Sequence, residues 1–197
     1  MTIRDFRVSR RWLAMSLVLL PLTLAPAPLV GGEEGAASPQ ELVQALRQAA
    51  AAKSISQMVP LIHPDDRPMM AFGMLMGAGF AAAFSDNAAA ATADLEALQK
   101  KFGLEGTVNP SGPPPESQEE MAAAARKAFA GVDLVGLIRA LIAFMDKHMK
   151  DADTPSVPKV PELESLKVEG DTATAVAGGE EAKFAKHGGR WYLRMEK

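Results

Sequence analysis

Apolar residues recur at helical spacing through most of the chain between residues 38 and 149. Within 133–149, Leu134, Ile138 and Leu141 fall on one side of a helix with 3.6 residues per turn. The pattern predicts five helices, which begin at or near residues 38, 66, 86, 117 and 133.

Residues that cap helices mark these expected starts. In "SPQE", Ser38 precedes Glu41 by three residues, which is the spacing of a capping box, and a proline occupies the first helical position. Ser117 and Glu120 repeat this spacing, and Asp133 is expected to cap the last helix.

The caps of the second and third helices are each predicted within a pair of residues. Asp65 or Asp66 is expected to cap the second helix, and Ser85 or Asp86 the third, which runs to Phe102.

The sixteen residues 69–84 lack any charged or hydrogen-bonding side chain. Their pattern predicts a central helix that is buried nearly all round, covered by helix 133–149 and by the C-terminal strands. Gly73, Gly77 and Ala81 form a smooth stripe at four-residue spacing, which we expect to meet another helix or to border a pocket. A leucine at Gly77 would then overpack and cost about 1–3 kcal/mol.

The period changes from 3.6 to 2 after residue 163. Short alternating segments are separated by Gly170-Asp171, Gly178-Gly179 and Gly188-Gly189, which suit tight hairpins and predict about four antiparallel strands. We therefore expect an α+β fold in one domain, 38–197, with a helical part (38–150), a proline-rich connector (151–162) and a β-meander (163–197). The Gly- and Pro-rich segment 103–116 is expected to be an irregular loop.

Composition narrows the classes of function. The chain has no Cys, which excludes disulfides and thiolate chemistry, and its formal net charge of −3 gives no basic surface for nucleic acid. Phosphate-binding glycine loops are absent and the three His are scattered, so neither a cofactor nor a metal site is predicted.

The N-terminal residues 1–32 have the order of a secretory signal peptide: a basic segment, an apolar run, then prolines and small residues. We expect cleavage between residues 32 and 37 and a periplasmic or secreted body. A retained membrane anchor is the alternative, and in that case this segment is the sole contact with the membrane. Arg10-Arg11 resembles a twin-arginine signal, but paired arginines are common in general secretory signals, which we favour.

The C-terminal sequence "VEGDTATAVAGGEEAKFAKHGGRWYLRME" resembles the last strands of exported nuclear-transport-factor-2-like domains, also described as cystatin-like or SnoaL-like. The resemblance implies a curved sheet packed on helices, in a family divided between small-molecule enzymes and non-catalytic binding modules. Members of this family usually have strands between early and late helices, whereas 67–150 is predicted to be helical here.

The densest polar cluster is "LIHPDDRP", which holds His63, Asp65, Asp66 and Arg67. The family resemblance implies that a His paired with a carboxylate could perform acid–base catalysis inside a cavity. The simpler interpretation is a Pro64 turn followed by a capping Asp, with Arg67 paired to a carboxylate, and we favour it.

The sequence leaves three functional hypotheses open. The first is a non-catalytic exported domain that binds a protein partner, an envelope component or a small apolar ligand, for which Arg67, Met74 and Tyr192 are candidate contacts. The second is a lyase, isomerase or hydrolase that uses His63 with Asp65 or Asp66. The third is a copper(I) module built on Met70 and Met74, since thioethers suit copper(I). The oligomeric state is not determined by the sequence.

Overall fold

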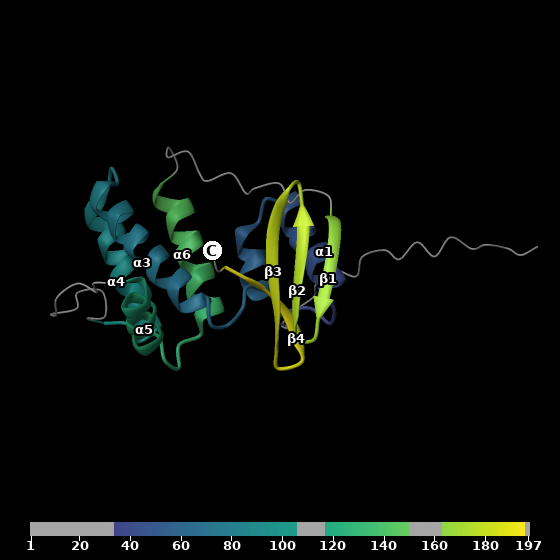
Figure 1. The fold of residues 1–197 in the computed structure, drawn as a ribbon. Coiled ribbons are helices and arrows are strands. Elements are labelled where there is room, and N and C mark those ends of the chain that lie inside the picture. Colours follow the sequence, from purple (N-terminus) through teal and green to yellow (C-terminus); the bar gives the residue numbers. More distant parts are fainter. Residues whose placement is uncertain (1–33, 106–116, 150–162, 196–197) are drawn as a thin grey trace, which may run out of the picture. The chain divides into compact units, whose positions relative to one another are not determined.

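The computed structural model describes residues 34–105, 117–149 and 163–195, and within these ranges the chain has an α+β fold (Figure 1). The expected signal peptide, the connector 151–162 and most of the loop 103–116 lie outside the described residues. The helices come first, and their bounds are α1 Pro39–Ala51, α2 Ile55–Met58, the 3₁₀ turn η1 Val59–Leu61, α3 Arg67–Phe84, α4 Ala88–Lys101, α5 Gln118–Ala128 and α6 Leu134–His148.

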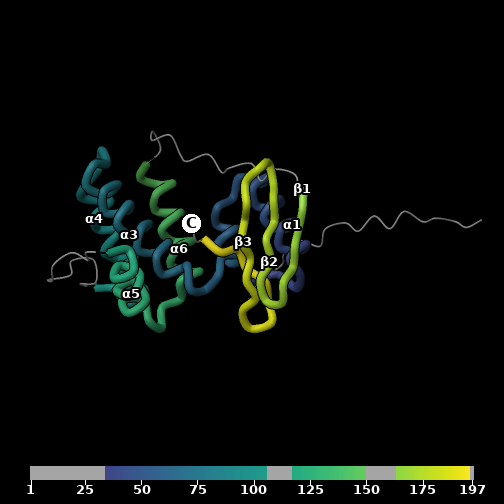
Figure 2. Tube along the Cα trace, in the orientation of Figure 1, coloured from purple at the N-terminus to yellow at the C-terminus, as the bar shows by residue number. Residues whose placement is uncertain are grey.

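The predicted meander is confirmed as a four-stranded antiparallel sheet in the order β1-β2-β3-β4. Its strands are β1 Leu163–Glu169, β2 Thr172–Ala177, β3 Glu180–His187 and β4 Arg190–Arg194, and Figure 2 follows the chain from one to the next. Each hairpin turns through two residues. Gly178 and Gly179 both have positive φ, of 62° and 78°, which only glycine adopts without strain and which the right-handed twist of a hairpin needs.

The buried apolar residues form two clusters. One contains only residues of the helices and of the segments next to them, drawn from η1 and α3 to α6, with Leu137, Ile138 and Leu141 fully buried at its centre. The other joins α1 to the sheet, where Leu42 and Leu46 pack with Phe184 and Trp191. Trp191 is therefore part of the core.

The helix α3 packs against α6, so the predicted cover by helix 133–149 is confirmed. It is not buried all round and is not covered by the strands, and that part of the prediction is wrong. Its buried side chains, such as Leu75 and Ala78, pack in the helical cluster, which contains no strand residue. A Cβ added to Gly73 or Gly77 would meet nothing within 4 Å, so a leucine at Gly77 would enter open space and would not overpack. The sequence pattern misleads here because an apolar composition does not show which faces are covered. None of the helices in the described residues is long and apolar enough to cross a membrane.

Most of the helix starts predicted from capping residues are confirmed. The hydroxyls of Ser38 and Ser117 and the carboxylate of Asp133 each accept a hydrogen bond from the backbone N–H three residues on. The predicted cap at Ser85 or Asp86 is wrong, because Asn87 caps α4 by accepting from the N–H of Ala90. Three polar residues in a row offer alternative caps, and the backbone path chooses among them.

Candidate functional site

The polar segment before α3 lies along the outer edge of β4. Ile62 forms a parallel bridge with Leu193, and the N–H of His63 donates to the carbonyl of Leu193 at 2.8 Å. Ahead of α1, Ala36 pairs with Trp191 through two hydrogen bonds of 2.9 and 2.8 Å. Two short segments therefore occupy the hydrogen-bonding groups of β4 that β3 leaves free, and they place the side chains of 34–36 and 62–67 beside the sheet.

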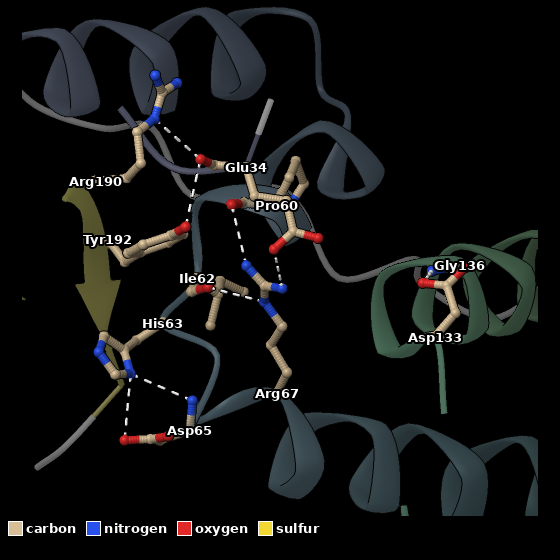
Figure 3. Close-up of polar contacts among 10 residues, drawn as sticks. All are labelled: Glu34, Pro60, Ile62, His63, Asp65, Arg67, Asp133, Gly136, Arg190 and Tyr192. Carbon is tan, nitrogen blue, oxygen red and sulfur yellow. Dashed lines mark hydrogen bonds and ion pairs between the residues drawn. The ribbon is translucent and has the colours of Figure 1, made fainter. Parts of the chain in front are cut away.

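The guanidinium of Arg67 is buried and holds this region together. Its Nε donates to the carbonyl of Ile62 at 2.9 Å and its Nη2 to that of Pro60 at 3.3 Å. Its Nη1 pairs with the Glu34 carboxylate at 2.5 Å, and the guanidinium lies 5.7 Å from the ring centroid of Tyr192 (Figure 3). The prediction that Arg67 pairs with a carboxylate is confirmed, but its partner lies 33 residues away in the sequence.

His63 is 4% exposed, and its Nδ1 accepts two hydrogen bonds. One comes from the N–H of Asp65 at 3.2 Å and the other from Nη1 of Arg194 at 3.2 Å. Its ring also makes edge contacts with His187 and Tyr192, whose centroids lie 5.3 and 5.9 Å away. A nitrogen that accepts two hydrogen bonds has its lone pair in use, so these contacts favour the neutral imidazole.

The pKa of His63 is lowered from its ordinary value of 6.5. Burial is the main cause, because it removes the charged form from water, and the neighbouring Arg194 and His187 act in the same direction. Asp65 and Asp66 oppose the shift but do not reverse it.

Stability is therefore expected to fall as the pH drops below about 6.5. In that range the unfolded chain binds a proton at His63 that the folded domain does not, and the loss levels off below the folded pKa. Urea unfolding measured between about pH 7.5 and about pH 5 should show this slope in the wild type.

His63→Asn is the matched variant for this measurement. The asparagine oxygen can accept the same bond from Asp65, as in an Asx turn, but it does not titrate. The slope should be shallower in His63→Asn than in the wild type, and equal slopes in the two proteins would contradict the assignment.

Asp66 occupies the N-cap position of α3, but its side chain does not cap the helix. Its carboxylate accepts from the N–H of Met195 at 2.9 Å and pairs with Nε of Arg194 at 3.3 Å. Neither Asp65 nor Asp66 caps α3 with its side chain, so that prediction is wrong. The Asp66 carboxylate binds Arg194 and the N–H of Met195 at the end of β4 instead. The Asp65 side chain is 60% exposed, 3.7 Å from His63 and 3.8 Å from Arg194.

Of the predicted candidates, the structure brings together His63, Asp65, Asp66, Arg67 and Tyr192. It adds Glu34, Arg194 and His187, which sequence reasoning missed as members of a site because they lie far from residues 62–67 in the chain. Within the cluster, Nδ1 of His63, the Asp66 carboxylate, the Arg67 guanidinium and the Tyr192 hydroxyl each have a hydrogen-bond partner in the protein. These contacts can hold the segment before α3 against β4. They also occupy Nδ1 of His63, the atom that would accept a proton if His63 acted as a general base.

Met74 lies apart from this cluster. With Met70 it packs against the helical core, where methionine fills irregular space. Among the residues that the structure describes, no three His, Asp or Glu side chains are grouped to hold a metal ion.

A second polar group links α4 to α6. The Asp94 carboxylate accepts from Nζ of Lys147 at 2.6 Å and lies 2.9 Å from Nε2 of His148. The hydrogen bond from Lys147, followed by that from His148, lowers the pKa of Asp94. Asp94 is open to solvent, so we interpret this group as a surface ion pair with a structural role.

The other notable surface is the outward side of α3, which we call the α3 face. Helical spacing puts on one side of the helix residues that are all uncharged: Gly73, Met76, Gly77, Phe80, Ala83 and Phe84. The exposed fractions are 38% for Met76, 62% for Phe80 and 85% for Phe84. Large apolar side chains that are exposed next to one another mark interaction surfaces more often than single ones do.

Comparison of the chain with protein-family models, with curated proteins and with solved structures gave no match. The resemblance to nuclear-transport-factor-2-like domains therefore stays a prediction, and the functional argument depends on the two surfaces described above.

Proposed function

We propose that this chain is an exported, non-catalytic domain that binds a protein through the α3 face. The observation that carries the proposal is the exposure of Phe80 and Phe84 on one side of a helix whose other side is in the core. Leaving two phenylalanines in water forgoes on the order of 2 kcal/mol of burial for each. A protein partner that covers them would recover that free energy.

The polar cluster around His63 supports a role without catalysis. Its Nδ1 accepts from Asp65 and Arg194, and the Asp66 carboxylate is held by Arg194 and Met195. An enzyme that uses His63 with a carboxylate would have to break these bonds before it could accept a proton from a substrate. We therefore place the enzyme hypothesis second and the copper(I) hypothesis third.

Export is the part of the proposal that depends on residues 1–32. The contacts of Glu34 and Ala36 with Arg67 and Trp191 favour cleavage ahead of Glu34, at the upstream end of the predicted window. The mature domain would then keep every residue that the structure places against β4.

Site-specific photo-crosslinking tests the proposal in cells that produce the protein. A benzophenone amino acid at Phe80 is expected to form a covalent adduct with another protein chain, because this side chain is 62% exposed on the α3 face. The adduct is detected by its mass on a denaturing gel and identified by peptide mass spectrometry.

Val168 provides the matched control. It is an apolar residue of similar exposure, 48%, on β1, away from the helical cluster. The same crosslinker there should give no specific adduct. Equal labelling at Phe80 and Val168, or no adduct at Phe80, would contradict the proposal.

A further inference from the structure

We infer that the partner of the α3 face is a second copy of this chain, with the two α3 helices antiparallel across a twofold axis between Met76 and Gly77. This inference rests on the proposed function, since it names the occupant of the same face. Two properties of the face support it, the positions of its large and small residues and its lack of charge, and its area indicates how tight the association is.

On the α3 face, Gly73 lies in the N-terminal half and leaves open space, whereas Phe80 and Phe84 project from the C-terminal half. Met76 and Gly77, one large and one small, lie on either side of the proposed axis. Phe80 and Gly73 lie at equal distances along the helix on either side of the proposed axis. Antiparallel pairing would therefore set each Phe80 over the other copy's Gly73, while parallel pairing would oppose phenylalanine to phenylalanine.

The lack of charge suits association of identical chains. A twofold interface buries the same patch on both partners, so any charged residue on it would lose its water in both copies. The α3 face carries no charged side chain, although the chain as a whole has a formal net charge of −3. Antiparallel packing also sets the dipoles of the two helices in opposite directions, which is favourable.

The area of the face indicates a weak, reversible dimer. The exposed parts of Phe80, Phe84 and Met76 amount to roughly 350 Å² per copy, if a whole side chain of this size offers about 200 Å². A standard interface takes about 800 Å² from each partner. Neighbouring surface must supply the remainder, and we expect a dissociation constant in the micromolar range.

Sedimentation of the purified domain over about 10–500 µM should show a monomer–dimer equilibrium in this affinity range. Phe80→Ser should shift the protein to monomer, while Val168→Ser, a loss of similar apolar exposure on the sheet, should leave the equilibrium unchanged. Both positions are exposed, so neither change is expected to unfold the domain.

The orientation is testable because the chain has no Cys, so that an introduced cysteine can pair only with another copy. Under mild oxidation, Met76→Cys should form a disulfide with itself near the axis. Phe80→Cys mixed with Gly73→Cys should form a mixed disulfide, whereas Phe84→Cys alone should not pair. Efficient pairing of Phe84→Cys with itself would overturn the antiparallel arrangement.

Two results separate this inference from the proposed function. A monomer at all concentrations, together with a Phe80 adduct to a different protein, would refute the second copy and leave the binding function standing. A monomer without any adduct at Phe80 would refute both.

Discussion

Replacing Arg67 with methionine is expected to lower the free energy of unfolding by about 3–5 kcal/mol. The substitution removes the donors to the buried carbonyl of Ile62 and to the partly buried carbonyl of Pro60, and it leaves the Glu34 carboxylate without its ion pair. Methionine fills much of the same volume, so the loss measures the missing polar contacts more than a cavity. Urea unfolding of the purified domain gives the value.

Arg139→Met is the matched control for this experiment. Arg139 is exposed and its Nε donates to one carbonyl, that of Ser56 at 3.1 Å, so its loss should cost less than about 1 kcal/mol. Arg67→Lys keeps the charge but cannot form the same fork of bonds, and it should be clearly less stable than the wild type. A loss below about 1 kcal/mol in Arg67→Met would show that Arg67 does not hold the segment.

A chain that begins at Ala37 is expected to be less stable than one that begins at Glu33 by at least about 3 kcal/mol. Cleavage at the downstream end of the predicted window would remove Glu34, the partner of Arg67, and the two hydrogen bonds between Ala36 and Trp191. It would also remove the carbonyl of Glu34, which accepts from Arg190 Nε at 3.2 Å and from the Tyr192 hydroxyl at 3.4 Å. Thermal unfolding of the two purified chains measures the difference.

Glu34→Gln in the longer chain separates the ion pair from the backbone contacts. Glu34→Gln should lower the stability of the domain by less than the truncation does, because the Ala36 bridge and the Glu34 carbonyl stay in place. If the two chain lengths unfold at the same temperature, the segment ahead of α1 contributes nothing, and the preference for cleavage before Glu34 would have to be withdrawn.

The elements were predictable wherever neighbours in the sequence supply the chemistry. The Ser38, Ser117 and Asp133 caps form within three residues, and glycines at 178 and 179 permit a turn whose φ values other residues avoid. Alternation after residue 163 predicted the four strands for the same reason, because side chains two residues apart share a face of a sheet.

The polar cluster was predictable in part. The sequence identified His63, Asp66 and Arg67 as its densest polar stretch and favoured a structural role for them. It did not give the partners, since Glu34 lies 33 residues from Arg67 and Arg194 lies 131 residues from His63. Asp66 shows the consequence most clearly: a local rule predicted a helix cap, and the end of β4 provided stronger partners.

The sequence by itself determined the order of elements, their type and most of their ends, because hydrophobic period, caps and turn glycines act over a few residues. Only the tertiary structure decided which face of α3 is covered and what surrounds His63 and Arg67. The covered face of α3 and the surroundings of these two residues both depend on which distant segments of the chain come together. An apolar composition allows a helix to be buried, but each of its faces is buried only where another element packs against it. On α3 that neighbour is absent beside Phe80 and Phe84 among the described residues, and the exposed face that results is the surface on which the proposed function depends.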